Sequence, residues 1–316
     1  LILCAVAIVL FATPVQACTS AVVSGKVTPD GRPLLWKNRD TDFMQNHIDY
    51  VKGEKYNFIA VVNSANAYLK EAWMGTNSSG FALMNTQSYN LVDVKGDEER
   101  GAANGRVIYR ALEVCATVED FCHFLDTISK PSDIEANFGV IDAQGGAAMF
   151  EVDYYKYVMY DANNPKDAPY GYIARTNFSF AGKVNEGAGY VRYMEADQVL
   201  MKASATGSIT PQFIFNDLSR SFRNRMLDID LRSGAYNRPQ ASGWFVDQDF
   251  IPRSSTSCSV VVQGVKPGEK AELTTMWTLL GYPPTGIAIP LWVKDAGKLL
   301  PGMVRFGKEH EAAPLS

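Results

Sequence analysis

The chain has 316 residues, of which 47% are hydrophobic and 20% charged, a composition typical of a globular protein long enough for one large domain or two small ones. The formal net charge is −4 and no basic block is interleaved with aromatic residues, which argues against nucleic acid as a partner. Five cysteines are too few for a disulfide scaffold.

An uncharged apolar run, LILCAVAIVLFA, opens the sequence. Its length suits the core of a secretory signal and is too short to cross a bilayer comfortably. Pro14 then interrupts any helix, and Val15 and Ala17 place small residues three and one positions before Cys18, as a signal peptidase requires. We predict that residues 1–17 are a signal peptide truncated at its start, and that a secreted or periplasmic chain begins at Cys18.

Two other interpretations of this segment stay open. Residues 1–17 could form a buried core helix, or Cys18 could be lipid-modified and anchored to a membrane. Gln16 is large and polar where a lipoprotein signal usually has a small residue, so we expect release rather than anchoring. Once the signal is removed, no stable insertion into a membrane is expected.

The mature chain is predicted to begin with a β-hairpin. Residues 19–25 and 33–36 have the pattern of two strands, and the Pro-Asp-Gly turn at 29–31 joins them. The polar run Lys37-Asn38-Arg39-Asp40 follows directly, and we expect the chain to leave the sheet there. Cross-strand pairing would bring this run back near Cys18.

Strands and two helices follow in the first half of the chain. A strand is predicted at 57–63, and residues 73–85 contain two short apolar runs around an Asn-Ser-Ser-Gly turn. Apolar residues at helical spacing predict a helix over 105–116. A second helix is expected from a capped start at 117–120 to Ile128.

The second half returns to strands, then helices, then strands. Predicted strands are 138–142, 147–153, 157–160, 170–177, 257–263 and 271–279, and predicted helices are 191–201 and 211–218. Because these elements are grouped rather than alternating, we expect an α+β fold in which antiparallel sheets pack against segregated helices.

Familiar catalytic patterns are missing from the sequence. His123 lies within a predicted helix, His310 in a polar C-terminal tail, and His47 in a polar loop without an evident carboxylate partner. Metal-binding spacings, phosphate-binding glycine loops and a serine nucleophile elbow do not occur, so no metal or cofactor is expected. Cys18 remains, and as a terminal residue it would carry a nucleophilic thiol and a basic α-amine together.

Cys18-Thr19-Ser20, followed by Lys37-Asn38-Arg39-Asp40, resembles the opening of N-terminal-nucleophile hydrolases. The similar group comprises choloylglycine hydrolases, acid-ceramidase-like amidases and penicillin acyltransferases. Its motif is Arg-Asn-x-Asp, so Lys37 stands where that group has arginine. The resemblance implies a four-layer αββα sandwich of two antiparallel sheets, with residues 18–316 as one catalytic domain.

The same resemblance implies roles for the opening residues. Cys18 would be the nucleophile, and its thiol would give a proton to its own α-amine. Asp40 would orient that amine through a charge-assisted hydrogen bond. Lys37 would favour the thiolate or steady the site electrostatically, but its point charge cannot make the two-point contact of an arginine. Arg39 could take over that role only if the strand twists, because alternation puts it on the face opposite Asp40.

Three later residues match the similar group one by one. Asn85 ends the run GFALMN and would donate a hydrogen bond to the oxyanion of the tetrahedral intermediate. Asn177 follows Arg-Thr at a strand end and would hold the substrate amide and the amine of Cys18. Arg192 at a helix start would support the charge of the pocket. Without the resemblance, the two asparagines would be interpreted as caps of strand ends or turns, which is the usual role of such residues, and Arg192 could be a solvated helix residue.

Three further cysteines follow Cys18. Cys115 and Cys122 would be about 10 Å apart on one continuous helix, too far for a disulfide, although a break before Thr117 would permit one. Otherwise they are expected to be buried thiols. Cys258 lies in an apolar strand and is expected in the core.

We therefore expect an enzyme that hydrolyses a linear, non-peptide amide C–N bond through an acyl thioester on Cys18. Its partner would be a small acyl amide such as an N-acyl amino acid or a bile salt conjugate. An acyltransferase shares the first half-reaction, and a lipid-tethered protein that binds a ligand without chemistry is the other alternative. The sequence is compatible with a homo-oligomer but does not specify one.

Overall fold

The computed structural model describes residues 17–93, 101–234, 247, 249–305 and 312–316. Apart from Ala17, the predicted signal peptide lies outside the described residues, as does His310. Within the described ranges, no helix is long and apolar enough to span a membrane.

Six antiparallel strands form the first sheet, in the order β10-β1-β2-β13-β14-β15. Their bounds are β1 (Thr19–Val23), β2 (Leu34–Asp40), β10 (Tyr172–Arg175), β13 (Thr256–Gln263), β14 (Thr275–Leu280) and β15 (Ile289–Leu291). Every residue of β1 and β2 is buried, because these strands lie inside the sheet and both of its faces are covered. Residues 271–273, predicted as strand, instead form a 3₁₀ turn before β14.

The polar run at 37–40 stays inside β2, so the prediction that the chain leaves the sheet there is wrong. Lys37 pairs with Ser20 of β1 and with Val260 of β13. Asp40, the last residue of β2, still pairs with Thr256. These polar side chains can be buried because groups from other elements form hydrogen bonds with them. The local sequence does not reveal those distant partners.

Seven strands form the second sheet, and they follow one another in chain order. They are β3 (Asn46–Val51), β4 (Phe58–Asn63), β5 (Met74–Asn77), β6 (Ala82–Gln87), β7 (Ala136–Ile141), β8 (Ala147–Val152) and β9 (Tyr157–Asp161). Strand β3 was not predicted, and His47 lies in it, buried, rather than in a polar loop. The ring Nδ1 of His47 lies 3.0 Å from the hydroxyl of Ser64, and burial lowers the pKa of His47 to about 4.

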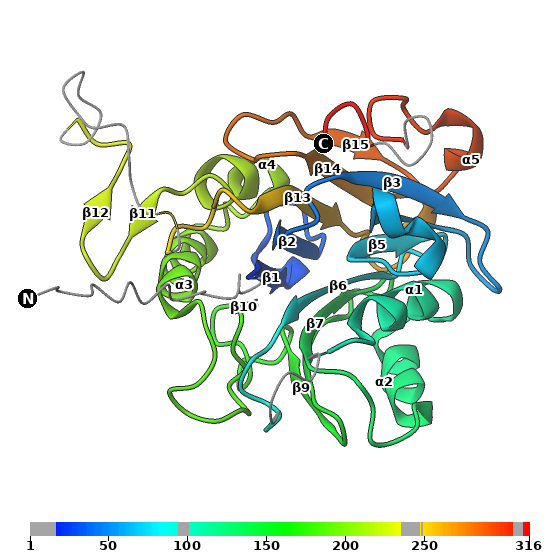
Figure 1. Cartoon of the computed structure of the whole chain (residues 1–316), viewed down its shortest axis with the longest axis horizontal. Coiled ribbons are helices and arrows are strands. Elements are labelled where there is room, and N and C mark those ends of the chain that lie inside the picture. Colours follow the sequence, from blue (N-terminus) through cyan, green and yellow to red (C-terminus); the bar gives the residue numbers. More distant parts are fainter. Residues whose placement is uncertain (1–16, 94–100, 235–246, 248, 306–311) are drawn as a thin grey trace, which may run out of the picture.

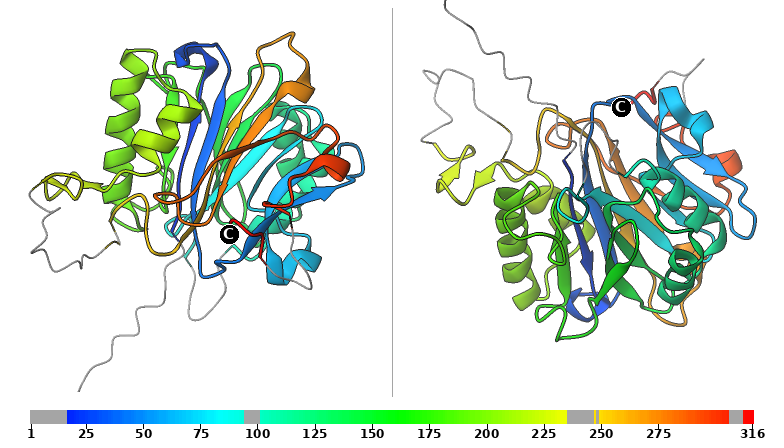
Figure 2. Two further views of the ribbon diagram at one scale, coloured as in Figure 1. Left: turned by 90° about the horizontal axis from the view of Figure 1, so that it is seen from above. Right: turned by 60° about the horizontal axis from the view of Figure 1, so that its bottom comes forward.

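Helices cover both outer faces and complete the expected αββα sandwich (Figures 1 and 2). Helices α1 (Asn104–Val114) and α2 (Val118–Thr127) pack on the second sheet. Helix α3 (Tyr190–Ala205), the short α4 (Pro211–Phe213) and a π-helical turn at Ile214–Leu218 pack on the first. The smaller elements are β11 (Arg223–Asn224), β12 (Ile229–Asp230), α5 (Ala296–Leu299) and 3₁₀ turns at Gly25–Val27, Ser64–Leu69 and Ala271–Leu273.

The predicted capped start of α2 is confirmed. The Thr117 hydroxyl accepts the N–H of Asp120, and the Asp120 carboxylate accepts the N–H of Thr117 in return. This reciprocal pair satisfies two amides that the first helical turn leaves without partners.

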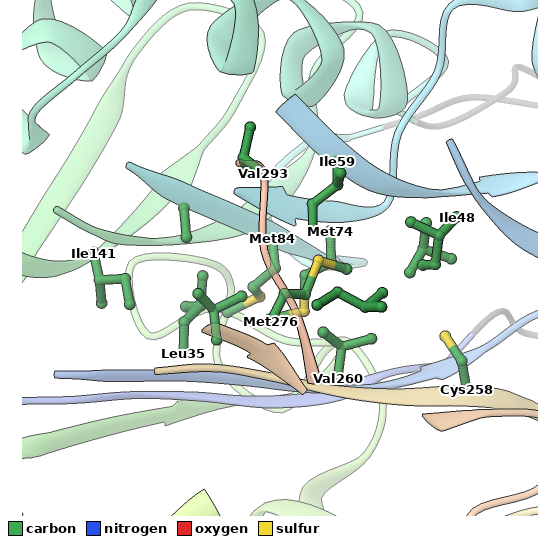
Figure 3. Close-up of a cluster of buried hydrophobic side chains, with 14 of the residues drawn as sticks. Leu35, Ile48, Ile59, Met74, Met84, Ile141, Cys258, Val260, Met276 and Val293 are labelled. Carbon is green, nitrogen blue, oxygen red and sulfur yellow. The ribbon is translucent and has the colours of Figure 1, made fainter. Parts of the chain in front are cut away.

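Three apolar layers hold the sandwich together. The central one lies between the sheets and contains Leu35, Met84 and Met276 (Figure 3). The other two lie under the helices, and Trp36 belongs to the one beneath α3. Each such side chain contributes roughly 1.5–3 kcal/mol when fully buried. Because strand residues alternate, Lys37 and Arg39 share the inter-sheet face of Leu35, and Asp40 shares the face of Trp36.

Candidate active site

The first hairpin brings Cys18 beside the polar end of β2, as predicted. Thr19 pairs with Asn38 and Ser20 with Lys37, so Cys18 lies next to the last residues of the strand. Its Sγ is 3.8 Å from the backbone oxygen of Asp40. The side chain is buried, and in this chain its nitrogen is still in a peptide bond to Ala17.

Arg192 fixes the backbone on which the thiol stands. Its Nη1 donates to the carbonyl of Cys18 at 2.7 Å and to Thr19 Oγ1 at 2.9 Å. Arg192 is fully buried, and burial lowers the pKa of its guanidinium while the nearby Asp40 opposes the change. Gly189, at φ 85°, precedes α3, and a Cβ there would overlap Nη2 of Arg192. Glycine is therefore required for the guanidinium to reach Cys18.

Asn177 connects Cys18 to both sheets. Its Oδ1 accepts the N–H of Cys18 at 2.9 Å and Nη2 of Arg192 at 2.9 Å. Its Nδ2 donates to the carbonyl of Gln87, the last residue of β6, at 2.8 Å. The amide is thus fixed at both ends, with its oxygen directed at the nitrogen of the cysteine.

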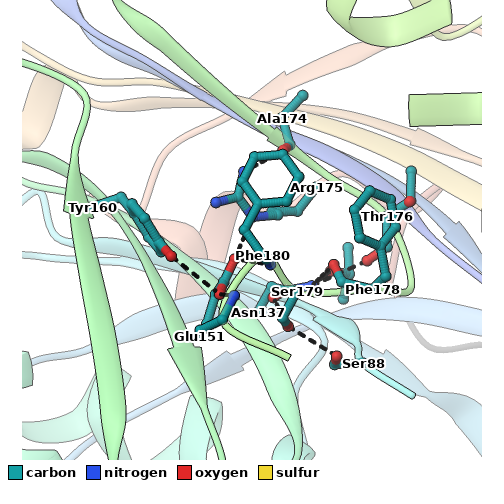
Figure 4. A network of polar contacts seen from close by, with 12 residues as sticks. Ser88, Asn137, Glu151, Tyr160, Ala174, Arg175, Thr176, Phe178, Ser179 and Phe180 are labelled. Atoms are coloured by element: carbon teal, nitrogen blue, oxygen red, sulfur yellow. Dashed lines mark hydrogen bonds and ion pairs between the residues drawn. The ribbon is translucent and has the colours of Figure 1, made fainter. Parts of the chain in front are cut away.

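Buried polar groups of the second sheet hold the loop that carries Asn177 (Figure 4). Nδ2 of Asn137 donates to the carbonyls of Thr176 and Phe178, one on each side of Asn177, both at 3.1 Å. The carboxylate of Glu151 accepts Nε of Arg175 at 2.7 Å and the N–H of Phe180 at 2.9 Å. Two strands of the opposite sheet therefore set the position of this asparagine.

Lys37 and Asn85 meet across the space between the sheets. Nζ of Lys37 donates to Asn85 Oδ1 at 2.9 Å and to the carbonyl of Trp73 at 3.1 Å. In the part of the chain that the structure describes, Nδ2 of Asn85 has no hydrogen-bond partner, so it is available as a donor. Arg39 instead donates to Asn46 Oδ1 at 2.5 Å and to Asn63 Oδ1 at 2.8 Å. Lys37, not Arg39, is therefore the cation that contacts Asn85.

Asp40 lies on the other face of β2, as alternation predicted. Thr256 Oγ1 donates to its Oδ1 at 2.6 Å, and Nε of Arg253 is 3.9 Å from its Oδ2. Thr256 pairs with Asp40 across the two strands, and the register of β13 shifts between Thr256 and Cys258. Burial raises the pKa of Asp40 to about 6, and the charges of Arg192 and Arg253 limit the rise.

The raised pKa of Asp40 predicts a pH-dependent stability. The ordinary value is 3.8, so the folded protein holds this proton more tightly than the unfolded chain does. The resulting stabilisation is complete below about pH 3.8 and is lost as the pH rises through about 6. Between these limits the wild type should lose about 3 kcal/mol of unfolding free energy relative to Asp40→Asn. Urea unfolding of both proteins from pH 4 to 7 measures this, and parallel curves would contradict it.

Thr256 and Arg253 were not predicted from the sequence. Thr256 is 216 positions from the aspartate that it contacts. Neither residue belongs to a motif, so no sequence signal could have found them.

Among the predicted residues, Arg192 is buried at the site rather than on a solvated helix face.

The six predicted residues gather at one end of the sandwich. They are Cys18, Lys37, Asp40, Asn85, Asn177 and Arg192. With Ala17 attached, the N–H of Cys18 is bonded by Asn177, not by Asp40. A cavity of about 810 Å³ lies at the opposite end, where Tyr50, Asn77 and Lys294 line it, and it includes none of the six.

The other described cysteines are unpaired. Helix α1 ends at Val114 and α2 begins at Val118, so the chain does break before Thr117, yet Cys115 and Cys122 form no disulfide. Cys258 is buried between the sheets, as predicted (Figure 3).

Solved structures similar to this chain share little sequence with it. An N-acylethanolamine-hydrolyzing acid amidase ortholog of Caenorhabditis elegans is 16% identical, with 64% of this chain and 89% of that chain covered and a TM-score of 0.43. A mutant of the conjugated bile acid hydrolase from Clostridium perfringens is 14% identical, covering 87% and 92%, with a TM-score of 0.47. Penicillin V acylase from Agrobacterium tumefaciens is 16% identical, covering 87% and 86%, with a TM-score of 0.43. No curated protein sequence matches significantly.

A match to a protein-family model assigns the chain to a family. The model described as acyl-coenzyme A:6-aminopenicillanic acid acyl-transferase matches residues 27–204, more than half of the chain. The matched range contains Lys37, Asp40, Asn85, Asn177 and Arg192, and it begins after Cys18. Two antiparallel sheets between helical layers, with these side chains assembled beside Cys18, agree with the resemblance to N-terminal-nucleophile hydrolases. The chain belongs to the penicillin acyltransferase family of N-terminal-nucleophile enzymes.

Proposed function

We propose that this protein is an amidase that cleaves a linear, non-peptide amide C–N bond through an acyl thioester on Cys18. The main support is the hydrogen-bonded cluster in which Asn177 accepts the Cys18 nitrogen while Arg192 holds its carbonyl. This arrangement fixes a thiol and the adjacent nitrogen at the end of a buried strand. Removal of the residues before Cys18 would turn that nitrogen into a basic amine.

In the proposed acylation, the thiol loses its proton to the α-amine and the sulfur attacks the acyl carbonyl. Asn85, whose Oδ1 accepts Nζ of Lys37, would donate to the oxyanion through its Nδ2, and one such donor contributes about 2.7–4 kcal/mol in a serine protease. Asp40, buried near Arg253, would accept a hydrogen bond from the ammonium form of the amine. The α-ammonium group returns the proton to the leaving amine as the C–N bond breaks, and water then hydrolyses the thioester to the free acid and the thiol.

The acyl group can be sought with protein that begins at Cys18. Candidate substrates are N-acylglycines, N-acylethanolamines, bile salt conjugates and penicillin V, three of which correspond to the compounds named for the similar structures. After rapid quenching, the intact mass should rise by the mass of the acyl group, and peptide mapping should place the addition on Cys18. Acylation of another residue, or of none with the whole panel, would refute the proposal.

A second candidate is an acyltransferase, which the description of the matching family favours. It shares the thioester and differs only in the acceptor. Adding 6-aminopenicillanic acid to the acylated protein distinguishes the two functions, because a transferase forms a new amide at the expense of the free acid. A hydrolase releases the free acid at an unchanged rate.

We also propose that the chain is exported and that maturation exposes Cys18. Sequencing of the N-terminus of the exported protein should begin at this residue. An added diacylglyceryl mass and a blocked amine would instead support the lipid-anchored alternative, in which Cys18 has no catalytic role.

A further inference from the structure

Asn137 is a fully buried amide that joins the second sheet to the loop after β10. It lies on β7, opposite Thr86 of β6. Its Nδ2 donates to the Thr86 hydroxyl and, across the space between the sheets, to the carbonyls of Thr176 and Phe178, each at 3.1 Å (Figure 4). Its Oδ1 accepts the Ser179 hydroxyl at 2.6 Å. Both polar atoms of this side chain are therefore used to hold the loop.

The two asparagines proposed for catalysis lie on opposite sides of this contact. Asn85 belongs to β6, which is paired with β5 on one side and with β7 on the other, so the sheet itself holds it. Asn177 lies beyond the end of β10, between the two carbonyls that Asn137 bonds. The separation of Asn85 and Asn177 therefore depends on the groups that join the second sheet to this loop.

Directional contacts are needed to fix that separation. The apolar layer between the sheets is non-directional, whereas a hydrogen bond requires both a distance and an angle. The amide of Asn177 donates to the carbonyl of Gln87 at 2.8 Å, but rotation about this single contact would turn its Oδ1 away from the nitrogen of Cys18. The bonds from Asn137, one on each side of Asn177, oppose that rotation.

We propose that Asn137 is a positioning residue that holds Asn177 at a fixed separation from Asn85. In the proposed mechanism Asn177 orients the nitrogen of Cys18 and Asn85 donates to the oxyanion, so both must be aligned on the same acyl carbonyl. Asn137 acts through the loop, because within the described ranges its hydrogen bonds reach neither Cys18 nor Asn85. Its effect on turnover rests on the proposed function, whereas its effect on the Cys18 nitrogen does not.

Asn90 provides a matched control in the same loop. It is also buried, and its Nδ2 donates to the carbonyls of Ser179 and Lys183, both at 3.0 Å. Asn137→Ser and Asn90→Ser each remove an amide that bonds two carbonyls of this loop, so both should lower the free energy of unfolding by similar amounts. Only Asn137→Ser removes the contacts that flank Asn177.

The first test uses the chain with Ala17 retained, in which the N–H of Cys18 donates to Asn177 Oδ1 at 2.9 Å. Native-state hydrogen exchange of this N–H is followed by NMR, relative to the slowest amides of the protein. Asn137→Ser should accelerate the exchange by about tenfold or more, and Asn90→Ser by less than about threefold. An unchanged rate in Asn137→Ser, or equal acceleration in both variants, would overturn the proposal.

Asn137→Thr repeats this test with a smaller risk of unfolding. Threonine is favoured in strands, and its short hydroxyl cannot reach across the sheets to the two carbonyls. The variant should therefore show the same acceleration at Cys18 as Asn137→Ser. Exchange at the wild-type rate in folded Asn137→Thr, with folding checked by circular dichroism, would also overturn the proposal.

The second test measures turnover of an N-acylglycine by protein that begins at Cys18. Because a misplacement of about 1 Å can cost about 10²-fold, Asn137→Ser should lower kcat/KM by roughly 10- to 10²-fold. In protein that already carries Asn177→Ala, the same substitution should lower kcat/KM by less than about threefold, since the residue through which it acts is absent.

Equal losses in the two backgrounds would show that Asn137 supports only the fold, and the proposal would fail. If the N-acylglycine and the other amides of the panel do not acylate Cys18, the amidase function fails instead. The exchange rate of the Cys18 N–H then still decides whether Asn137 positions Asn177.

Discussion

Replacing Cys18 with alanine should abolish acylation and lower amide turnover by on the order of 10⁴-fold or more, because it removes the thiol on which the acyl intermediate is proposed to form. Cys18→Ser should be nearly as inactive, since a hydroxyl is a much weaker nucleophile at neutral pH than a thiol. Steady-state kinetics and intact mass with the best amide of the panel measure both effects.

Cys122→Ser provides the control for this prediction. Cys122 is a half-buried free thiol on α2, outside the site, and its replacement should leave turnover unchanged. Retention of Ala17 is expected to lower turnover strongly as well, because the nitrogen of Cys18 then has no basic lone pair. Full activity of Cys18→Ala, or loss of activity in Cys122→Ser, would show that the nucleophile has been misassigned.

Arg192→Met should have the second largest effect. It removes the donors to the Cys18 carbonyl, to Thr19 and to Asn177, and leaves buried oxygens without partners. We expect turnover to fall by roughly 10²- to 10³-fold and the free energy of unfolding to fall by about 3 kcal/mol. The pKa of Asp40 should rise further, because the charge of Arg192 is the main influence that lowers it, so the acidic limb of the pH–rate profile should move to higher pH.

Two variants make the Arg192 result specific. Arg192→Lys keeps the charge but cannot bond three groups in a planar fork, so an intermediate loss of turnover is expected. Arg110→Met removes an exposed arginine of α1 that pairs with Glu54 and Glu113, and it should cost less than about 1 kcal/mol without affecting turnover. An acidic limb that does not move in Arg192→Met would contradict the proposed coupling to Asp40.

Local sequence patterns were sufficient for most of the helices and strands. The capping pair of Thr117 and Asp120 and the turn before β6 each depend on a few adjacent residues, so they could be predicted with little knowledge of the rest of the chain. Grouping of these elements then indicated antiparallel sheets with separate helical layers. The bounds of individual strands were less accurate, as for β14, where packing decides which residues pair.

Prediction failed where buried polar residues depend on distant partners. Strand β3 contains Asn46 and His47, which resemble loop residues in the sequence but are buried by contacts with Arg39 and Ser64. The polar end of β2 is a second example. In both cases the physical reason for burial is a hydrogen bond that forms only after folding, so hydrophobic periodicity cannot detect it.

For the site, resemblance carried more information than periodicity. It identified Asn177 and Arg192, and the structure brings both into contact with Cys18. It did not indicate Thr256 or Arg253, which approach Asp40 from β13 and the loop before it. The replacement of the motif arginine by Lys37 was visible at once, but its burial between two neutral acceptors was not.

The order of the strands affects how the molecule must assemble. In the second sheet the strands lie in the order in which they occur in the chain, so each strand can pair with the one before it. The entropic cost of closing the connecting loops is then small. In the first sheet, β2 is flanked by β1 and by β13, and its pairing with β13 joins Asp40 to Thr256. Such long-range closure is slow. The surroundings of the nucleophile are therefore among the last parts to form, and a nascent chain that has not reached β13 has no assembled catalytic centre.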